Sequence, residues 1–230
     1  MRMKPSKLIV YSNRRINKLL RFMNSDVNEL GLQEWEATMR VYNLAIEIGR
    51  NEGADLEILA PAALLHDLGK IYETREGTPH HIAGVARKVQ LLQSAGYSEE
   101  EIKRIIDTIS VHQKKLTPNA ASLEGKVLQD ADNVDEMGLV GLIRSAMWHS
   151  KKGDPIYLPE SLDRHPRTKP EMHIASPSVL DHLYDKLLTL DNILNTKTGK
   201  RLGRQRIRTM SNLVATLKDE ILAQDRSVGK

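Results

Sequence analysis

The chain has 230 residues and a mass of 26.0 kDa, enough for one domain or slightly more with a sizeable core. Apolar residues make up 40%, charged residues 28% and aromatic residues only 4%, which favours packed helices over a β-sandwich. The absence of cysteine excludes disulfides, thiolate catalysis and cysteine-bound zinc, so a metal ion must bind His, Asp or Glu. A net charge of +4 does not by itself indicate nucleic acid binding. The composition therefore predicts an all-α protein.

The first helix is predicted over residues 33–52, where apolar residues recur at helical spacing before Gly53. A second helix over 56–67, with Asp55 as its cap, is apolar nearly all round and should be buried. Pro61 should kink this helix or begin its regular part.

Gly69 should end the second helix, and a third helix is predicted over 79–95. A fourth helix over 98–112 begins with Ser98 and Glu101, the spacing of a capping box.

One or two further helices are predicted over 123–150. Helical periodicity returns over 179–194 and again over 207–221. Before residue 179, five of the nine prolines predict an extended segment: Pro155, Pro159, Pro166, Pro170 and Pro177.

We expect a helical core over residues 1–150, a Pro-rich crossover or lid over 151–177, and C-terminal helices over 178–230 in the same domain. The longest apolar run near the basic N-terminus, residues 8–11, is too short for a signal peptide, and no later stretch is long enough to span a membrane. A soluble, cytoplasmic protein is therefore expected.

A candidate site lies at the end of the second helix, where His66 precedes Asp67. Burial of these groups is unfavourable without a partner, and a divalent cation is one such partner. The dipeptide alone is a weak signal, because a capping Asp beside a hydrogen-bonded His explains it as well.

The acidic segment 130–136 is a second candidate. Asp130 and Asp132 would point in nearly opposite directions on a helix, so only one can face a given site, and we select Asp132. Asp135 and Glu136 should support the site or contact a basic group. The spacing does not match a calcium loop, and a solvated acidic turn is the alternative.

Four of the eight histidines lie at predicted helix ends in the first half of the chain: His66, His80, His81 and His112. A single histidine at a helix C-terminus is usually a favourable dipole contact. With the carboxylates above, the four histidines form a candidate site for Mn, Fe, Co, Ni, Zn or Mg.

Four ordered segments resemble the HD superfamily of metal-dependent phosphohydrolases: AALLHDLGK at 62–70, PHHIAG at 79–84, ISVH at 109–112, and QDAD at 129–132 followed by Asp135 and Gly138. The resemblance extends over residues 33 to about 215, and the ordered combination is specific although each piece alone is not. It implies an all-α bundle, a divalent metal cofactor and hydrolysis of a phosphomonoester, pyrophosphate or phosphodiester bond in a nucleotide-like substrate.

By this resemblance, His66 and Asp67 match the paired metal ligands of the family, and Asp132 matches its late ligand. His80, His81 and His112 match additional histidines that members use for a second metal or for the substrate phosphate. Asp67 would also orient or deprotonate the attacking water.

The chain departs from the family at Ala37. The first ligand of the family is a histidine three residues before an Arg-Val pair, here Arg40 and Val41, and Ala37 occupies that position. Loss of one ligand should weaken metal binding at least roughly 10–100-fold. Water or His112 are candidates to fill the vacancy. The alanine is either an introduced change or the mark of a natural pseudoenzyme.

The substrate phosphate needs basic partners. Lys70, one turn beyond Asp67, is the main candidate and is also expected to assist catalysis, followed by Arg144. Lys186 and Arg206 are weaker candidates, because an exposed charge without a function is the more common explanation.

Two other functional classes stay open. The basic residues over 197–208 could follow nucleic acid phosphates, although a solvated helix surface explains them more often. A nucleotide-sensing pseudoenzyme would keep the pocket without turnover. Leu183, Leu187 and Leu190 would suit either a homodimer interface or the core.

Overall fold

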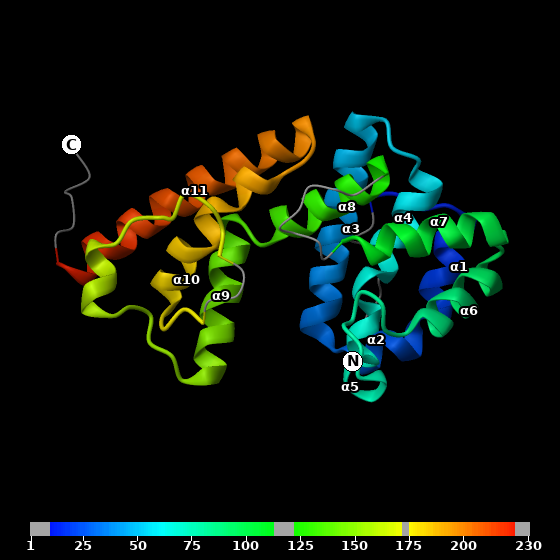
Figure 1. The fold of residues 1–230 in the computed structure, drawn as a ribbon, viewed down its shortest axis with the longest axis horizontal. Helices are drawn as coiled ribbons and strands as arrows, with labels where there is room; N and C mark the ends of the chain where they lie inside the picture. The colour runs from blue at the N-terminus through cyan, green and yellow to red at the C-terminus, as the bar shows by residue number, and fades with distance from the viewer. Residues whose placement is uncertain (1–9, 113–121, 172–174, 224–230) are drawn as a thin grey trace. The chain divides into compact units, whose positions relative to one another are not determined.

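The computed structural model describes residues 10–112, 122–171 and 175–223, which form helices and turns without a β-strand among them (Figure 1). The predicted all-α class is confirmed. The chain divides into two compact units: unit 1 comprises residues up to Asp132 together with 195–199, and unit 2 comprises 133–194 and the residues from Lys200 onward. The three-part division expected from the sequence stays a prediction, because a compact unit is not the same as an independent domain.

Unit 1 contains the elements α1 (Arg14–Phe22), α2 (Asn24–Leu30), α3 (Leu32–Glu52), α4 (Leu56–Leu65), the 3₁₀ segment η2 (His66–Ile71), α5 (Glu73–Glu76), α6 (Val85–Ala95), α7 (Glu99–Ser110) and most of α8 (Leu123–Asp135). The sequence analysis did not anticipate α1 and α2. Their polar sequences carry few core residues, and Ile16 and Leu19 are the buried apolar residues of α1.

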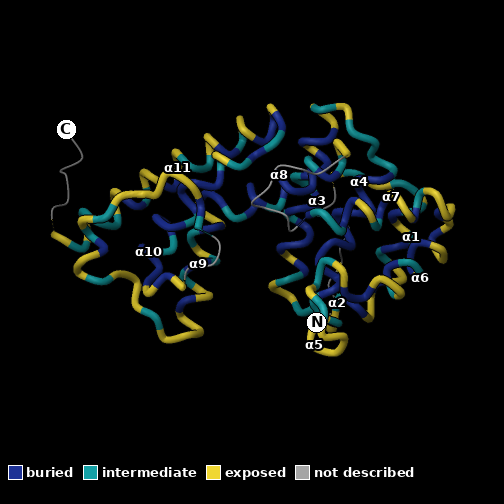
Figure 2. The backbone as a smooth tube through the Cα atoms, in the orientation of Figure 1, coloured by how far each residue is buried: buried dark blue, intermediate teal, exposed yellow. Residues whose placement is uncertain are grey.

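Helix α4 is the centre of unit 1. Its residues from Ile58 to Leu65 are all buried, and it contacts both α3 and α7 (Figure 2). Pro61 lies inside α4 and cannot donate to the carbonyl of Glu57, yet the helix continues to Leu65. The chain then tightens into η2, which places His66 and Asp67 inside the unit with 1% and 8% of their surface exposed.

Local signals predicted several helix ends correctly. Helix α3 ends at Gly53, and the Asp55 side chain accepts a hydrogen bond from the Glu57 amide at the start of α4. At the start of α7, Ser98 and Glu101 make both hydrogen bonds of the capping box.

Three predicted boundaries were wrong. The helix expected over 79–95 begins only at Val85, because Gly84 takes a positive φ of 65° and residues 79–84 form a turn. The helix expected from 207 is the second half of α11 (Lys197–Ile221). The Pro-rich segment is not wholly extended, because Pro159–Asp163 forms the 3₁₀ segment η3.

Unit 2 contains α9 (Gly138–Lys152), η3, α10 (Val179–Asp185), η4 (Leu187–Ile193) and α11 from Lys200 onward. Helix α10 contacts α9 and η4. Leu183, Leu187 and Leu190 are buried within the chain, which favours the core over a dimer interface for these side chains. In the described part of the chain, no helix combines the length and the apolar character needed to cross a bilayer.

Candidate metal centre

Three imidazoles and one ammonium surround the carboxylate of Asp67, at the start of η2. Asp67 Oδ2 lies 3.3 Å from His66 Nε2, and Asp67 Oδ1 lies 3.5 Å from His80 Nε2 and 3.9 Å from His112 Nε2. One ligand atom each from Asp67, His80 and His112 lie within 4.8 Å of one another. We call Asp67, His66, His80, His112 and Lys70 the Asp67 cluster; it joins residues from η2, the 79–84 turn and the end of α7.

The two most buried imidazoles are oriented by main-chain carbonyls. His66 Nδ1 lies 2.8 Å from the Ala63 carbonyl oxygen, and His112 Nδ1 lies 2.6 Å from that of Ile109. A carbonyl only accepts, so Nδ1 carries the hydrogen in each ring, and Nε2 of the neutral ring keeps its lone pair. Metal-binding histidines usually make this kind of hydrogen bond with the ring nitrogen that does not bind the metal.

The charges of the cluster stabilise one another. Burial alone would raise the pKa of Asp67, but His66 and Lys70 hold that pKa well below its ordinary value. Burial lowers the pKa of His112 to about 3, with His66 acting in the same direction. A neutral His112 can therefore act as a ligand across the physiological pH range.

Asp132 acts on the same imidazoles. Burial would lower the pKa of His66, but Asp67 and Asp132 raise it, whereas at His112 the charge of Asp132 only opposes the lowering by burial. Asp130 has another role: its carboxylate accepts hydrogen bonds from the amides of Asn195 and Thr196 at 2.7 and 2.8 Å. These partners support the choice of Asp132 over Asp130, although the role of Asp132 as a ligand stays a prediction.

Lys70 bridges two carboxylates. Its Nζ lies 2.8 Å from Asp67 Oδ2 and 2.6 Å from Glu34 Oε2. Burial would lower the pKa of Lys70, but Asp67 and Glu34 raise it above its usual value, so the side chain is an ammonium. Sequence reasoning missed Glu34, whose only signal was its place one helical turn before Ala37.

Ala37 is 5% exposed and lies in α3, which contacts η2. Residues three apart share a helix face, so Ala37 lies on the face from which Glu34 reaches Lys70. The position therefore faces the element that carries Asp67.

His80 and His81 belong to the 79–84 turn. The His80 amide donates to Glu73 Oε1 at 3.2 Å, a partner that the sequence analysis did not anticipate. Burial lowers the pKa of His80. The His81 ring centroid lies 6.4 Å from that of His112, so His81 is at the edge of the cluster.

The basic candidates from unit 2 have partners inside that unit. Arg144 Nη1 lies 2.6 Å from Asp135 Oδ2, and Lys186 Nζ lies 2.6 Å from Glu136 Oε2. Arg206 donates to the Val134 carbonyl at 2.8 Å. Their predicted phosphate contacts stay predictions.

The chemistry of the cluster suits a divalent cation. Imidazole nitrogen and carboxylate oxygen are the ligand types of Zn, Fe, Ni, Mn and Co, and this mixed set does not favour Ca. The orientation of His66 and His112 leaves suitable lone pairs. The residues present therefore fit a bound metal ion.

Comparison with known proteins identifies the family of the chain. The family model for the HD domain matches residues 35–137. YpgQ of Bacillus subtilis (strain 168), an uncharacterized protein, is 32% identical over 194 residues, covering 82% of this chain and 84% of YpgQ. The chain belongs to the HD-domain family, whose domains bind divalent metals.

Solved structures show the same fold. An HD-superfamily hydrolase from Bacillus thuringiensis superposes with a TM-score of 0.71 at 27% identity, over 91% of this chain and all of that one. The crystal structure of B. subtilis YpgQ in complex with ADP superposes with a TM-score of 0.67 at 28% identity, over 90% of this chain and 97% of that one. The chain has the fold of the HD-superfamily hydrolases.

Proposed function

We propose that the protein is a metal-dependent phosphohydrolase that acts on a nucleotide or a similar small phosphoester. The observation that carries the proposal is the convergence of Asp67, His80 and His112, with ligand atoms within 4.8 Å of one another. These residues would hold the cation, with His66 and Asp132 beside them. A bound divalent cation would lower the pKa of a coordinated water and neutralise charge on the phosphoryl oxygens.

The side chains around the cation have separable tasks. Asp67 is held ionised, so it can accept a hydrogen bond from the attacking water and orient it. Lys70 is 30% exposed and can donate to a phosphate oxygen when Glu34, which is more exposed, turns away. His81, at the edge of the cluster, would contact the same phosphate.

A nucleotide substrate is the favoured class. YpgQ, a relative over most of its length, has a crystal structure in complex with ADP. The cluster supplies one ammonium and three imidazoles, with His81 at its edge; these groups suit a phosphate group but do not recognise a base. The metal, and the bond that is cleaved, therefore have to be determined by assay.

The direct test compares the wild-type chain with Asp67→Asn. Wild type should bind Mn²⁺, Co²⁺ or Ni²⁺ and release phosphate or pyrophosphate from a panel of nucleotides, and Asp67→Asn should do neither. His149→Gln, a change in unit 2, is the matched control and should keep both properties. Equal activity in wild type and Asp67→Asn would contradict the proposal.

A nucleotide-sensing pseudoenzyme is the second candidate, and the observation that favours it is Ala37 on the α3 face beside η2. Ala37→His should strengthen Mn²⁺ binding roughly 10–100-fold if this position supplies a ligand. A wild type that binds ADP without forming product, together with an Ala37→His variant that turns over, would identify a sensor. Equal turnover by both would identify an enzyme that does not need the missing ligand.

A further inference from the structure

Lys88 is a buried cation that the proposed reaction does not use. It lies in the first turn of α6, and its side chain is among the largest that are fully buried, with 0% exposed. Burying an ammonium is unfavourable unless it is hydrogen-bonded. Burial accordingly lowers the pKa of Lys88 to about 8, opposed by the charges of Asp67 and Glu76. Because burying the Lys88 ammonium is unfavourable, other interactions of this side chain must compensate.

The partners of Lys88 are main-chain carbonyls of the turn that carries His80. Lys88 Nζ donates to the Ala83 carbonyl at 3.0 Å, and it lies 3.4 Å from the His80 carbonyl. Both carbonyls belong to residues 79–84, where the amides of Ile82 and Ala83 bond to the Pro79 carbonyl. The ammonium therefore holds the two ends of one short turn.

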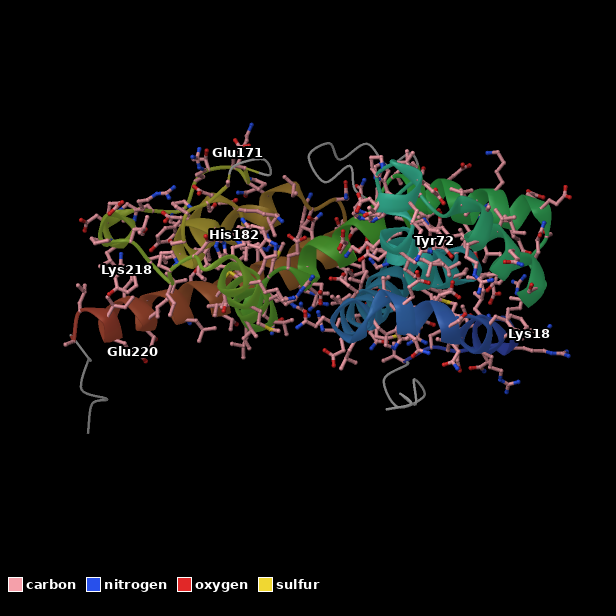
Figure 3. All side chains as sticks on the ribbon, turned by 90° about the horizontal axis from the view of Figure 1, so that it is seen from below. Lys18, Tyr72, Glu171, His182, Lys218 and Glu220 are labelled. Atoms are coloured by element: carbon pink, nitrogen blue, oxygen red, sulfur yellow. The ribbon has the colours of Figure 1, made fainter. Side chains whose placement is uncertain are left out.

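The same two carbonyls face η2 closely. A Cβ atom built at Gly69 would lie 1.8 Å from the His80 oxygen and 2.9 Å from the Ala83 oxygen, so only glycine fits there. Next to it, a Cβ at Gly84 would lie 2.6 Å from the ring of Tyr72, which is labelled in unit 1 in Figure 3. The turn is thus seated against η2, and Lys88 satisfies carbonyl oxygens that the close approach removes from water.

We propose that Lys88 is a positioning residue: by binding the carbonyls of His80 and Ala83, it fixes the 79–84 turn so that the His80 imidazole faces Asp67. The inference rests on the proposed function, in which His80 is a metal ligand. Lys88 acts through the turn and does not touch the cation or the substrate.

Charge alone would have the opposite effect on metal binding. Among the charged groups around Lys88, Asp67 acts on it most strongly. Lys88 therefore contributes positive potential at the carboxylate that would hold the cation. Removing that positive charge would strengthen the binding of a divalent cation. Loss of positioning would weaken it, and the sign of the change separates the two roles.

The experiment compares Lys88→Met, which keeps the length and apolar stem of the side chain, with wild type and with Lys103→Met. Lys103 lies in α7 with 77% of its side chain exposed, so its replacement should change nothing. In metal-free protein, Lys88→Met should accelerate amide hydrogen exchange at Ile82, Ala83 and Gly84 at least about 10-fold relative to α3. Calorimetric titration with Mn²⁺ should show binding weakened about 10-fold.

A double-mutant cycle tests the route of the effect. In a His80→Ala background, Lys88→Met should change Mn²⁺ affinity less than about 2-fold, because the residue that it positions is already gone. Tighter Mn²⁺ binding by Lys88→Met, unchanged exchange over 82–84, or an undiminished effect in the His80→Ala background would overturn the inference.

Two further outcomes are kept distinct. If wild type binds no Mn²⁺, the proposed function fails, whereas the exchange measurement on metal-free protein still decides whether Lys88 holds the turn. If Lys88→Met does not fold by circular dichroism, Lys88→Gln, which keeps a hydrogen-bond donor, replaces it with the same expected direction for both readouts.

Discussion

Each unit of the molecule buries a carboxylate that several partners share, and the partners differ. In unit 2, Asp185 accepts hydrogen bonds from Arg164 at 2.5 Å and from Arg167 and Ser176 at 2.9 Å. In unit 1, Asp67 is surrounded by His66, His80, His112 and Lys70.

The partner side chains determine what each carboxylate cluster can do. A guanidinium stays protonated and has no lone pair to offer, so the Asp185 site is closed and serves to hold the Pro-rich segment to α10. A neutral imidazole can be a ligand, and several imidazoles whose Nε2 atoms lie near one carboxylate can hold a cation together with it. Of the two clusters, the Asp67 cluster is therefore the one whose side chains can bind a metal ion.

The largest expected effect separates the two carboxylates by metal binding. Asp67→Asn keeps the shape of the side chain but removes the charge, and it should weaken Mn²⁺ binding more than about 100-fold because the anionic ligand becomes a neutral amide. Asp185→Asn should leave Mn²⁺ affinity within about 2-fold of wild type. Calorimetric titration of both variants measures this, and similar losses in the two would break the comparison.

Asp185 should instead contribute to the stability of the fold. Asp185→Asn leaves Arg167 without the Asp185 carboxylate and leaves Arg164 with Asp181 alone, and because both arginines are partly exposed we expect a loss of about 2–3 kcal/mol in the free energy of unfolding. Urea unfolding followed by circular dichroism gives this number. A loss below about 0.5 kcal/mol would mean that the cluster does not hold the segment.

His182, in unit 2, should make the stability of the protein sensitive to acid. Burial lowers the pKa of His182, which is labelled in Figure 3, to about 4, with Lys186 and His149 acting in the same direction. His182 Nδ1 lies 2.9 Å from Ser145 Oγ. In the unfolded chain its pKa is about 6.5, so below that pH the unfolded state takes up a proton that the folded state does not. The free energy of unfolding should therefore fall by about 2 kcal/mol from pH 6.5 to 4.5 and stay level above 6.5 as far as His182 is concerned.

His182→Gln should remove this share of the pH dependence while His112, whose pKa is also lowered, keeps its own share. Urea unfolding of wild type and variant at pH 7.5 and 4.5 measures the difference. Identical pH dependence in the two would contradict the assignment.

The smallest expected effects come from two serines that cap helices, one in each unit. Ser98 caps α7 at an exposed helix start, so Ser98→Ala should lower the free energy of unfolding by about 1 kcal/mol. Ser178 caps α10 and also donates to the buried carboxylate of Asp181 at 2.6 Å, so Ser178→Ala should lower it by about 2 kcal/mol. Thermal melts rank the two, and equal shifts would mean that the buried network adds nothing.

The features that the sequence predicted correctly depend on neighbours in the chain. The end of α3 at Gly53 and the capping box of Ser98 each need only residues within one turn. The start of α11 was missed because it depends on Asp130, whose carboxylate binds the Thr196 amide from a distant helix.

The candidate site divides in the same way. His66, Asp67, His80 and His112 were identified from histidines at predicted helix ends and from the resemblance to the HD superfamily, both of which are read from short segments, and the structure brings them together. Glu34 and Lys88 were missed, because an ordinary charged residue in a helix gives no sign that it meets a lysine from η2 or turns back to the carbonyls of the preceding turn.

The most direct measurement is a crystal structure of the wild-type chain soaked with Mn²⁺, with anomalous data collected at the manganese edge. The account predicts one anomalous peak in unit 1, at bonding distance, about 2.2 Å, from Asp67, His80 and His112. An anomalous peak at other residues, or none at saturating Mn²⁺, would contradict it.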